Sequence, residues 1–216
     1  MSLKKLLAAT LWIPLAALAQ ATPEPPAIAA RAWLLLDHGS GQALASLNPD
    51  ERVEPASLTK LMTAYLVFGA LKGGVLKPDQ VVPVSEKAWK TPGSRMFVEP
   101  NRPVRVDELL KGMIVQSGND ACIALAEAVA GTEAAFVERM NREAQRLGLA
   151  NTRFMNVTGL PDAQHYSTAR DLALLARAVI RDFPDFYPLY STREYTYNKI
   201  TQPNRNRLLW LDPTVD

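Results

Sequence analysis

Apolar side chains recur at helical spacing in the segment that begins near Ser57. They repeat every three or four positions, and further apolar residues widen the stripe until most sides are covered: Leu58, Leu61, Met62, Tyr65, Leu66, Val67 and Phe68. A helix that is apolar on nearly every face is stable only when neighbouring elements cover it. The pattern therefore predicts a helix at the centre of a domain.

Further helices are predicted downstream, over residues 107–115, 120–130, 132–147 and 168–182. Asp107 is a capping type of residue at the start of the first, and Thr168 opens a capping box with Asp171 at the start of the last. Glycine follows the second and third segments, at Gly131 and Gly148, where helices commonly end. The body of the chain is therefore predicted to be mostly helical.

Extended structure is predicted on both sides of this helical series. Residues 31–47 have the pattern of a hairpin, in which Trp33–Leu36 and Gln42–Leu47 flank the turn sequence DHGSG. Residues 75–106 are rich in Pro, Gly and Val and are expected to form a long excursion with short extended pieces. After Pro184 the aromatic and β-branched content rises, which favours an extended C-terminal segment.

The N-terminal segment has the features of an export signal. Lys4 and Lys5 precede an apolar run that extends to Ala19, and small residues allow cleavage after Ala19 or Ala21. A transmembrane anchor is the alternative, but at ~1.5 Å per residue the run would span only ~21 Å of a ~30 Å hydrocarbon core. We therefore expect residues 1–21 to be a cleaved signal peptide and the protein to be secreted or periplasmic.

Behind the signal the chain divides into two parts. Residues 22–30 are rich in proline and too polar and stiff to join a core, so they are expected to form a linker. Residues 31–216 show no internal repeat, and their length suits a single domain.

Composition narrows the classes of partner. The chain has 24 Lys and Arg against 22 Asp and Glu, and two of the lysines lie in the predicted signal. The rest has equal numbers of basic and acidic side chains, so no global positive field attracts nucleic acid. One cysteine, Cys122, excludes a disulfide framework, and the only histidines, His38 and His165, form no cluster of zinc-ligand spacing. No nucleic-acid partner, metal or other cofactor is expected.

The sharpest chemical signal is the sequence Ser57-Leu58-Thr59-Lys60 at the start of the apolar helix. A serine is a poor nucleophile unless a base stands beside it, and three positions are nearly one helical turn, so the Lys60 amine can reach the Ser57 hydroxyl. The alternative is a serine that only caps the helix and a lysine on its surface. The same spacing also occurs by chance between Ser2 and Lys5.

A second candidate is the turn Ser117-Gly118-Asn119 between two predicted helices. Such a turn can present a hydroxyl and an amide to a cleft beside a nucleophile. The alternative is an ordinary helix–helix turn in which Asp120 caps the next helix, because these residue types are common in turns.

Taken together, five segments resemble, in order and spacing, the low-molecular-mass penicillin-binding proteins, the serine-type D-alanyl-D-alanine carboxypeptidases of peptidase family S11. The segments are EPASLTK (54–60), LKGMIVQSGNDACIALAE (110–127), LGLANTRFMNVTGL (147–160), HYSTARD (165–171) and QPNRNRLLW (202–210). The resemblance extends from about residue 27 to the end of the chain. It implies an α/β fold of the serine β-lactamase and DD-peptidase (transpeptidase) type, an α+β sandwich in which helices cover an antiparallel sheet.

The resemblance also implies a reaction and a role for each matched residue. Ser57 would attack the penultimate carbonyl of a peptidoglycan stem pentapeptide, release the terminal D-alanine and pass through an acyl-enzyme, and β-lactams would acylate the same serine. Lys60 matches the general base, Ser117 the proton shuttle and Asn119 the residue that holds the substrate amide. Cys122 is expected to be a small buried residue, and His165 to be a structural residue of a loop.

One family motif has no counterpart in the sequence. The Lys-Thr-Gly motif is absent, since Lys90-Thr91-Pro92 lies upstream of Ser117 and has proline in place of glycine. The resemblance therefore implies an incomplete fold, an N-terminal hairpin plus a helical body whose later strands are missing. The hairpin would then have an exposed edge. An oxyanion donor would be absent, and Lys60 would more often be charged, because a neighbouring cation lowers a lysine pKa.

These departures leave alternatives open. We expect a fragment with impaired activity from a longer, active carboxypeptidase whose membrane anchoring uses regions outside this chain. A catalytically inert module that binds peptidoglycan or penicillin is one alternative, and an endopeptidase that cuts cross-links between stem peptides is another.

Overall fold

The computed structural model describes residues 24–216. The predicted signal peptide, residues 1–21, lies outside the described residues. Residues 24–30 are exposed and form neither helix nor strand. In the part of the chain that the structure describes, no helix combines the length and the apolar character needed to cross a bilayer.

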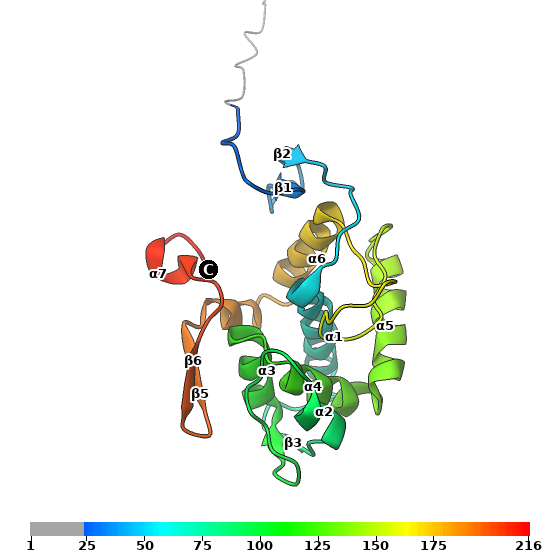
Figure 1. The fold of residues 1–216 in the computed structure, drawn as a ribbon, viewed down its shortest axis with the longest axis vertical. Coiled ribbons are helices and arrows are strands. Elements are labelled where there is room, and N and C mark those ends of the chain that lie inside the picture. Colours follow the sequence, from blue (N-terminus) through cyan, green and yellow to red (C-terminus); the bar gives the residue numbers. More distant parts are fainter. Residues whose placement is uncertain (1–23) are drawn as a thin grey trace, which may run out of the picture.

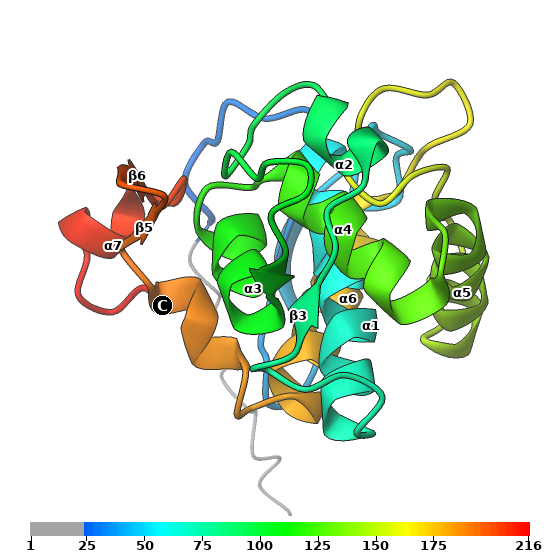
Figure 2. The same ribbon diagram turned by 90° about the horizontal axis from the view of Figure 1, so that it is seen from below.

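A buried helix, α1, lies at the centre of the molecule (Figure 1, Figure 2). The elements concerned are α1 (Lys60–Lys72) and the helices it contacts, α3 (Val106–Val115), α4 (Asn119–Ala130), α5 (Glu133–Arg146) and α6 (Ala169–Asp182). Met62, Val67 and Phe68 of α1 have no exposed surface. Burial of such a side chain stabilises the fold by about 1.5–3 kcal/mol. The predicted central helix is therefore confirmed.

Threonine hydroxyls cap two helices, and the cap at Thr168 confirms the start predicted there. The Thr132 hydroxyl accepts a hydrogen bond from the Ala135 N–H at 3.2 Å at the start of α5. The Thr168 hydroxyl accepts one from the Asp171 N–H at 3.1 Å at the start of α6. Each bond satisfies a backbone donor that has no partner within its helix.

Neither Asp107, the predicted cap, nor Asp120, the cap of the alternative interpretation, occupies a cap position. Helix α3 begins at Val106 rather than at Asp107, so Asp107 lies inside its first turn. Helix α4 begins at Asn119, so Asp120 lies inside its first turn, and its carboxylate accepts a hydrogen bond from the Ala121 N–H at 2.9 Å. It also accepts hydrogen bonds from the backbone N–H groups of Met96, Phe97 and Val98, at 2.9, 2.8 and 3.1 Å. Asp120 therefore fixes a distant loop onto α4.

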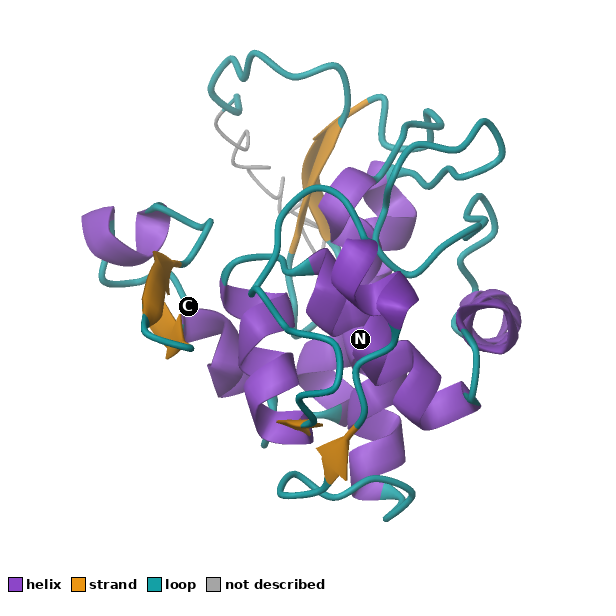
Figure 3. Cartoon of the chain, turned by 60° about the horizontal axis from the view of Figure 1, so that its bottom comes forward, coloured by secondary structure: helices purple, strands orange, loops and turns teal. Residues whose placement is uncertain are grey.

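The strands form three separate antiparallel pairs around the helical body (Figure 3). They are β1 (Trp33–Leu36) with β2 (Ala43–Leu47), β3 (Val81–Val82) with β4 (Val104–Arg105), and β5 (Glu194–Tyr197) with β6 (Ile200–Pro203). The predicted hairpin and the short extended pieces are thus present. Two helices were not predicted: α2 (Glu86–Lys90), which the Ser85 hydroxyl caps, and α7 (Leu208–Leu211) in the segment expected to be extended.

The β1–β2 hairpin lies over one end of α6 (Figure 1). Arg177 of α6 donates hydrogen bonds to the carbonyls of His38 and Gly39 in the hairpin turn, at 2.8 and 3.1 Å. Leu35 and Leu44 are more than half exposed, at 55% and 56%. Within the described residues the hairpin has no third strand, so the exposed edge expected from the sequence is present.

An ion-paired cluster closes the far end of α1 against α6. Asp182 accepts hydrogen bonds from Arg181 Nε and from the Tyr65 hydroxyl, each at 2.7 Å. The bond from Arg181 is the main cause that lowers the pKa of Asp182 to about 2; burial opposes it, and the bond from Tyr65 lowers the pKa further.

We expect Asp182→Asn to lower the Tm by roughly 2–4 °C near neutral pH. Because the native pKa of the carboxyl is depressed, its stabilising effect is complete above the unfolded value of 3.8 and is lost as the pH falls towards about 2. Thermal unfolding of variant and wild type should therefore converge over that interval. The exposed neighbour Asp185, changed to Asn, is the control and should show no such convergence.

Candidate active site

Ser57 lies on a short 3₁₀ turn, η1 (Ala56–Thr59), that leads directly into α1. We call these four residues the Ser57 turn. Ala56 has a left-handed backbone conformation, with φ of 46°, which is strained for a residue with a Cβ. Pro55 occupies the cap position, no side chain caps the turn, and Ser57 is exposed. The alternative of a serine that only caps a helix is therefore excluded.

Lys60 is the first residue of α1, and its amine lies beside the Ser57 hydroxyl. The Lys60 Nζ is 3.3 Å from Ser57 Oγ and donates a hydrogen bond to the Thr158 carbonyl at 2.7 Å. The lysine is 6% exposed. Burial lowers its pKa, Cys122 partly opposes this, and the Arg205 cation lowers it further. The fraction of neutral amine is therefore higher than in an ordinary exposed lysine.

Residues 150–168, which we call the backing loop, lie behind the Ser57 turn and α1. The Val157 carbonyl accepts hydrogen bonds from the Thr63 hydroxyl and the Cys122 thiol, both at 2.8 Å. Burial raises the pKa of Cys122 to about 12, so the thiol stays protonated and Cys122 is the small buried residue predicted. Gly159 packs so close to Ala56 that a Cβ at this position would lie 1.7 Å from the Ala56 carbonyl oxygen.

Ser117 reaches the same cleft from the α3–α4 connection. Its φ is 64°, another left-handed conformation in a residue other than glycine. Its Oγ is buried and, among residues 24–216, has no hydrogen-bond partner. A strained residue with an unsatisfied buried hydroxyl is costly for the fold, and such positions are found at functional sites.

Asn119 does not line the cleft. Its Nδ2 donates a hydrogen bond to the Pro92 carbonyl, and its backbone N–H donates one to the Ser94 carbonyl, both at 2.7 Å. The structure thus brings Ser57, Lys60 and Ser117 together at the cleft. The Asn119 side chain instead binds the loop that contains Pro92.

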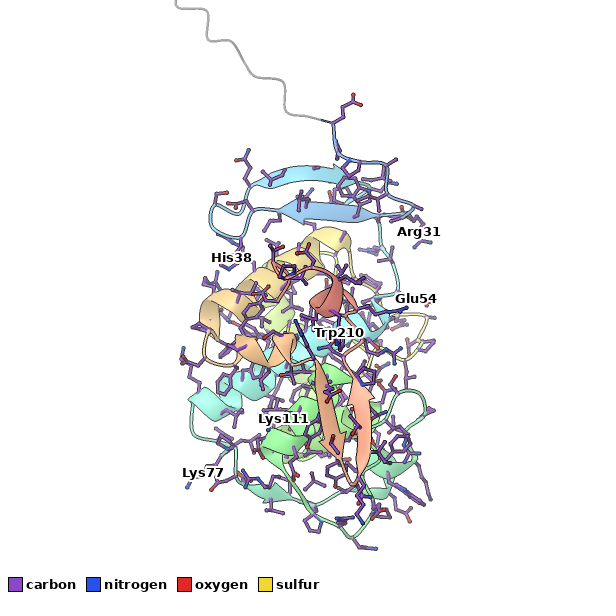
Figure 4. The ribbon with its side chains drawn as sticks, turned by 90° about the vertical axis from the view of Figure 1, so that its left-hand side faces the viewer. Arg31, His38, Glu54, Lys77, Lys111 and Trp210 are labelled. Atoms are coloured by element: carbon purple, nitrogen blue, oxygen red, sulfur yellow. The ribbon has the colours of Figure 1, made fainter. Side chains whose placement is uncertain are left out.

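The cleft between the Ser57 turn and the α3–α4 connection has a volume of about 510 Å³. Its walls are mostly apolar, with a smaller number of polar groups that include Ser57, Lys60 and Ser117. The apolar lining includes Leu58, Leu61, Met113, Ile114 and Tyr190. Asn204 and Arg205 also line an adjoining hollow of about 470 Å³ beside Trp210 of α7, the residue labelled in Figure 4. A few polar groups on an apolar wall are typical of a small-molecule site.

Arg205 is a residue of the cleft that sequence reasoning missed. Its backbone N–H donates to the Val115 carbonyl at 3.1 Å, and its Nη1 donates to the Ser94 hydroxyl at 2.8 Å. The preceding residue, Asn204, donates to the carbonyls of Tyr190 and Thr192, at 3.1 and 2.9 Å, which holds this segment beside the cleft. Arg205 lies within QPNRNRLLW, one of the segments that resemble the family, but the sequence does not show that this segment returns to the Ser57 cleft.

We expect Arg205→Gln to raise the pKa of Lys60, because it removes a cation that lowers it. If Lys60 must be neutral to react, the pH dependence of Ser57 acylation should move to higher pH in this variant. Rates of β-lactam acylation against pH measure the shift. Arg207→Gln is the matched control, since Arg207 lies outside the Ser57 cleft, and an equal shift in both variants would contradict the assignment.

Neither described histidine forms a serine–histidine pair with Ser57. His165 Nε2 lies 2.8 Å from the Thr59 hydroxyl, and its Nδ1 accepts a hydrogen bond from the Met155 N–H at 3.3 Å. His38 lies in the hairpin turn (Figure 4). Across residues 24–216 there is no group of three or more His, Cys, Asp or Glu side chains arranged to hold a metal ion.

The arrangement is suited to nucleophilic attack on a carbonyl carbon. A neutral Lys60 amine at 3.3 Å can accept the Ser57 proton as the oxygen attacks. The N-terminal end of α1 supplies a positive dipole end at the same place. No histidine or metal is required for this step, because nucleophile and base lie within one turn of chain.

Comparison with known proteins agrees with this chemistry. The family model for D-alanyl-D-alanine carboxypeptidase, peptidase S11, matches residues 19–216. The chain is 50% identical over 206 residues to D-alanyl-D-alanine carboxypeptidase DacC of Escherichia coli (strain K12), covering 93% of this chain and 52% of that protein. It is 47% identical over 195 residues to DacA of Haemophilus influenzae, covering 89% and 49%.

Solved structures of this family have the same fold. Penicillin binding protein 5 from Haemophilus influenzae matches with a TM-score of 0.86 and 47% identity, over 89% of this chain and 57% of that one. Penicillin binding protein 6B from Escherichia coli matches with a TM-score of 0.83 and 46% identity, over 87% and 61%. The fold class predicted from the sequence, helices with short sheets in the DD-peptidase arrangement, is thereby confirmed.

The matches cover most of this chain but only part of each relative. The chain spans about half the length of the curated relatives it matches, 52% and 49% of the two named above. The family model nevertheless covers nearly all of the chain, and the identities are high over that span. The chain therefore belongs to the D-alanyl-D-alanine carboxypeptidase family, peptidase S11.

Proposed function

We propose that this chain carries the nucleophile and base of a serine D-alanyl-D-alanine carboxypeptidase that removes the terminal D-alanine from peptidoglycan stem pentapeptides. The observation that carries the proposal is the Lys60 Nζ at 3.3 Å from Ser57 Oγ, beside a largely apolar cleft, in a chain of this family. The relatives named carboxypeptidase are 50% and 47% identical.

The proposed reaction begins at Ser57. Lys60 takes the hydroxyl proton as Ser57 Oγ bonds to the carbonyl carbon before the terminal D-alanine, and the C–N bond breaks. The proton then passes from Lys60 through the Ser117 hydroxyl, which is buried without a hydrogen-bond partner among residues 24–216, to the leaving amine, and D-alanine departs. Water next attacks the ester and gives a proton to Lys60, which returns it to Ser57 Oγ as the shortened peptide is released.

Asn119 is proposed to hold the substrate amide during this sequence. Its Nδ2 is bound to the Pro92 carbonyl, so contact with the substrate requires the side chain to exchange that bond for one to the peptide. The Arg205 cation in the cleft suits a substrate that ends in a carboxylate.

The partners and the location follow from the same proposal. Peptidoglycan stem peptides are the substrates, and β-lactams are inhibitors that acylate Ser57. Residues 1–21 direct export, so the protein works in the periplasm or outside the cell, and any association with the inner membrane uses regions outside this chain. Nucleic acid is not a partner.

The test is acylation and product analysis of the complete gene product. A labelled penicillin should form one covalent adduct on the peptide containing Ser57, and Ser57→Ala should abolish it. A monomeric pentapeptide muropeptide should lose one D-alanine. If Ser57 is not labelled and no muropeptide is cut, the chain is an inert binding module and the proposal is wrong.

The same assay separates the endopeptidase alternative. Release of monomers from a cross-linked dimer, with monomeric pentapeptide left intact, would identify an endopeptidase. A relative named D-alanyl-D-alanine endopeptidase, from Pseudomonas aeruginosa, is 34% identical over 187 residues, well below the identity to the carboxypeptidases. The carboxypeptidase is therefore favoured.

A further inference from the structure

A buried histidine joins the backing loop to the Ser57 turn. His165 is 4% exposed and lies in the loop, yet its Nε2 is 2.8 Å from the hydroxyl of Thr59, a residue 106 positions earlier in the chain. Its Nδ1 accepts a hydrogen bond from the backbone N–H of Met155 at 3.3 Å. The ring does not line the Ser57 cleft, so it acts on the site only through Thr59.

These two bonds define the protonation state of the ring. A backbone N–H can only donate, so Nδ1 must carry a lone pair to accept from Met155. A neutral imidazole with a free Nδ1 has its proton on Nε2, which then donates to the Thr59 hydroxyl. A doubly protonated ring would present an N–H to the Met155 N–H, and attraction would become repulsion.

Thr59 stands between the two residues proposed to react. It is fully buried on the Ser57 turn, two positions after Ser57 and one before Lys60. The same loop holds the Lys60 amine through the Thr158 carbonyl and presses Gly159 against the Ala56 carbonyl. A shift of the loop away from the turn therefore moves nucleophile and base together.

Charged groups of both signs surround the outer side of His165. It shares a hollow of about 390 Å³ with Arg31, Arg52, Glu54 and Asp162, and Figure 4 shows Arg31 and Glu54 on the same side of the molecule. Arg52 lies over the ring of Tyr166, 4.4 Å from its centroid, and Phe154 packs edge-on against the imidazole. Burial lowers the pKa of His165, and the carboxylates of Asp162 and Glu54 partly oppose this effect.

We propose that His165 is a positioning residue for Ser57, whose neutral ring holds the Ser57 turn through Thr59 and whose protonation releases the turn and slows acylation. The proposal rests on the proposed acylation of Ser57. Under this proposal the rate of Ser57 acylation falls in acid because His165 is protonated, although His165 contacts neither the substrate nor the nucleophile.

The expected signature is the slope of acylation rate against pH in the complete gene product. A requirement for neutral Lys60 alone gives about a tenfold fall in rate per pH unit on the acid side. A second requirement for neutral His165 steepens this towards about a hundredfold per unit below its own pKa, at a pH under about 6.5. A purely structural histidine changes stability without changing this slope.

Three variants test the link, each assayed with a labelled β-lactam on folded protein. His165→Gln keeps a donor that reaches Thr59 but cannot be protonated, so it should acylate within about threefold of wild type near neutral pH and lose the steep acid limb. His165→Phe and Thr59→Val should each acylate roughly tenfold more slowly, the effect of one lost hydrogen bond at a positioned site. The double variant should be no slower than either single one.

The outcomes separate this proposal from the proposed function. A wild-type protein that is not acylated overturns the proposed function and this inference with it. A wild type that is acylated, with unchanged rates and slopes in His165→Phe and Thr59→Val, overturns the inference alone. Nitrogen NMR of the wild-type imidazole gives an independent test: an Nε2–H tautomer near neutral pH is expected, and an Nδ1–H tautomer or a charged ring would contradict it.

Discussion

Lys60→Met is expected to slow acylation of Ser57 by a β-lactam by about 10²–10⁴-fold, the usual contribution of a general base. Methionine is close in length to the aliphatic stem of lysine but has no amine to take the Ser57 proton across the 3.3 Å that separates Lys60 Nζ from Ser57 Oγ. The rate of adduct formation on the complete gene product, measured with a labelled penicillin, tests the prediction.

We expect Lys60→Met to lower the acylation rate without lowering the stability of the fold. The pKa of Lys60 is lowered by burial, so the unfolded chain binds a proton more readily than the folded one, and the charged lysine costs stability below pH 10.5. Lys60→Met should therefore keep or raise the Tm near neutral pH. Lys60→Arg retains the charge but not the ability to act as a base, and a rate close to wild type in that variant would show that Lys60 acts only through its charge.

Gly159→Ala is expected to be the most disruptive single-methyl substitution in the backing loop. Its Cβ would lie 1.7 Å from the Ala56 carbonyl oxygen and 2.9 Å from the Thr59 hydroxyl, at a backbone φ of 83°. Because the nearest contact is backbone, no side-chain rotation relieves it, and the Ser57 turn must move. We expect at least a 10²-fold fall in acylation rate, since a displacement of about 1 Å at a reacting centre has an effect of this size.

Gly131→Ala is the control that separates the effect of backbone strain from that of the contact with Ala56. Gly131 has a similar φ of 79°, and a Cβ there has no atom within 4 Å in the described structure. Gly131→Ala should therefore lose only the roughly 1–3 kcal/mol of an alanine in a sparsely populated backbone conformation (φ 79°, ψ −35°), a Tm decrease of several degrees, and retain acylation. Equal acylation in Gly159→Ala and Gly131→Ala would show that the backing loop does not set the position of Ser57.

The sequence alone determined the local parts of this protein. The apolar residues from Leu58 to Phe68 predicted the central helix because they recur at helical spacing and cover nearly every face, and Thr168 marked a helix start because a cap bonds within its own turn. Ser57 and Lys60 were found for the same reason, since three positions along the chain place both groups on one turn.

The tertiary structure alone decided how the site is supported. The Thr158 carbonyl that holds Lys60, the His165 ring that meets Thr59 and the Arg205 cation beside the cleft come from segments about 100 positions or more away along the chain. Asp120, a helix cap in the alternative interpretation of the turn, lies inside the first turn of α4 and also binds the backbone of residues 96–98. Spacing predicts contacts only within a turn or a hairpin, whereas these contacts arise when α1 is buried and the returning chain has to pack around it.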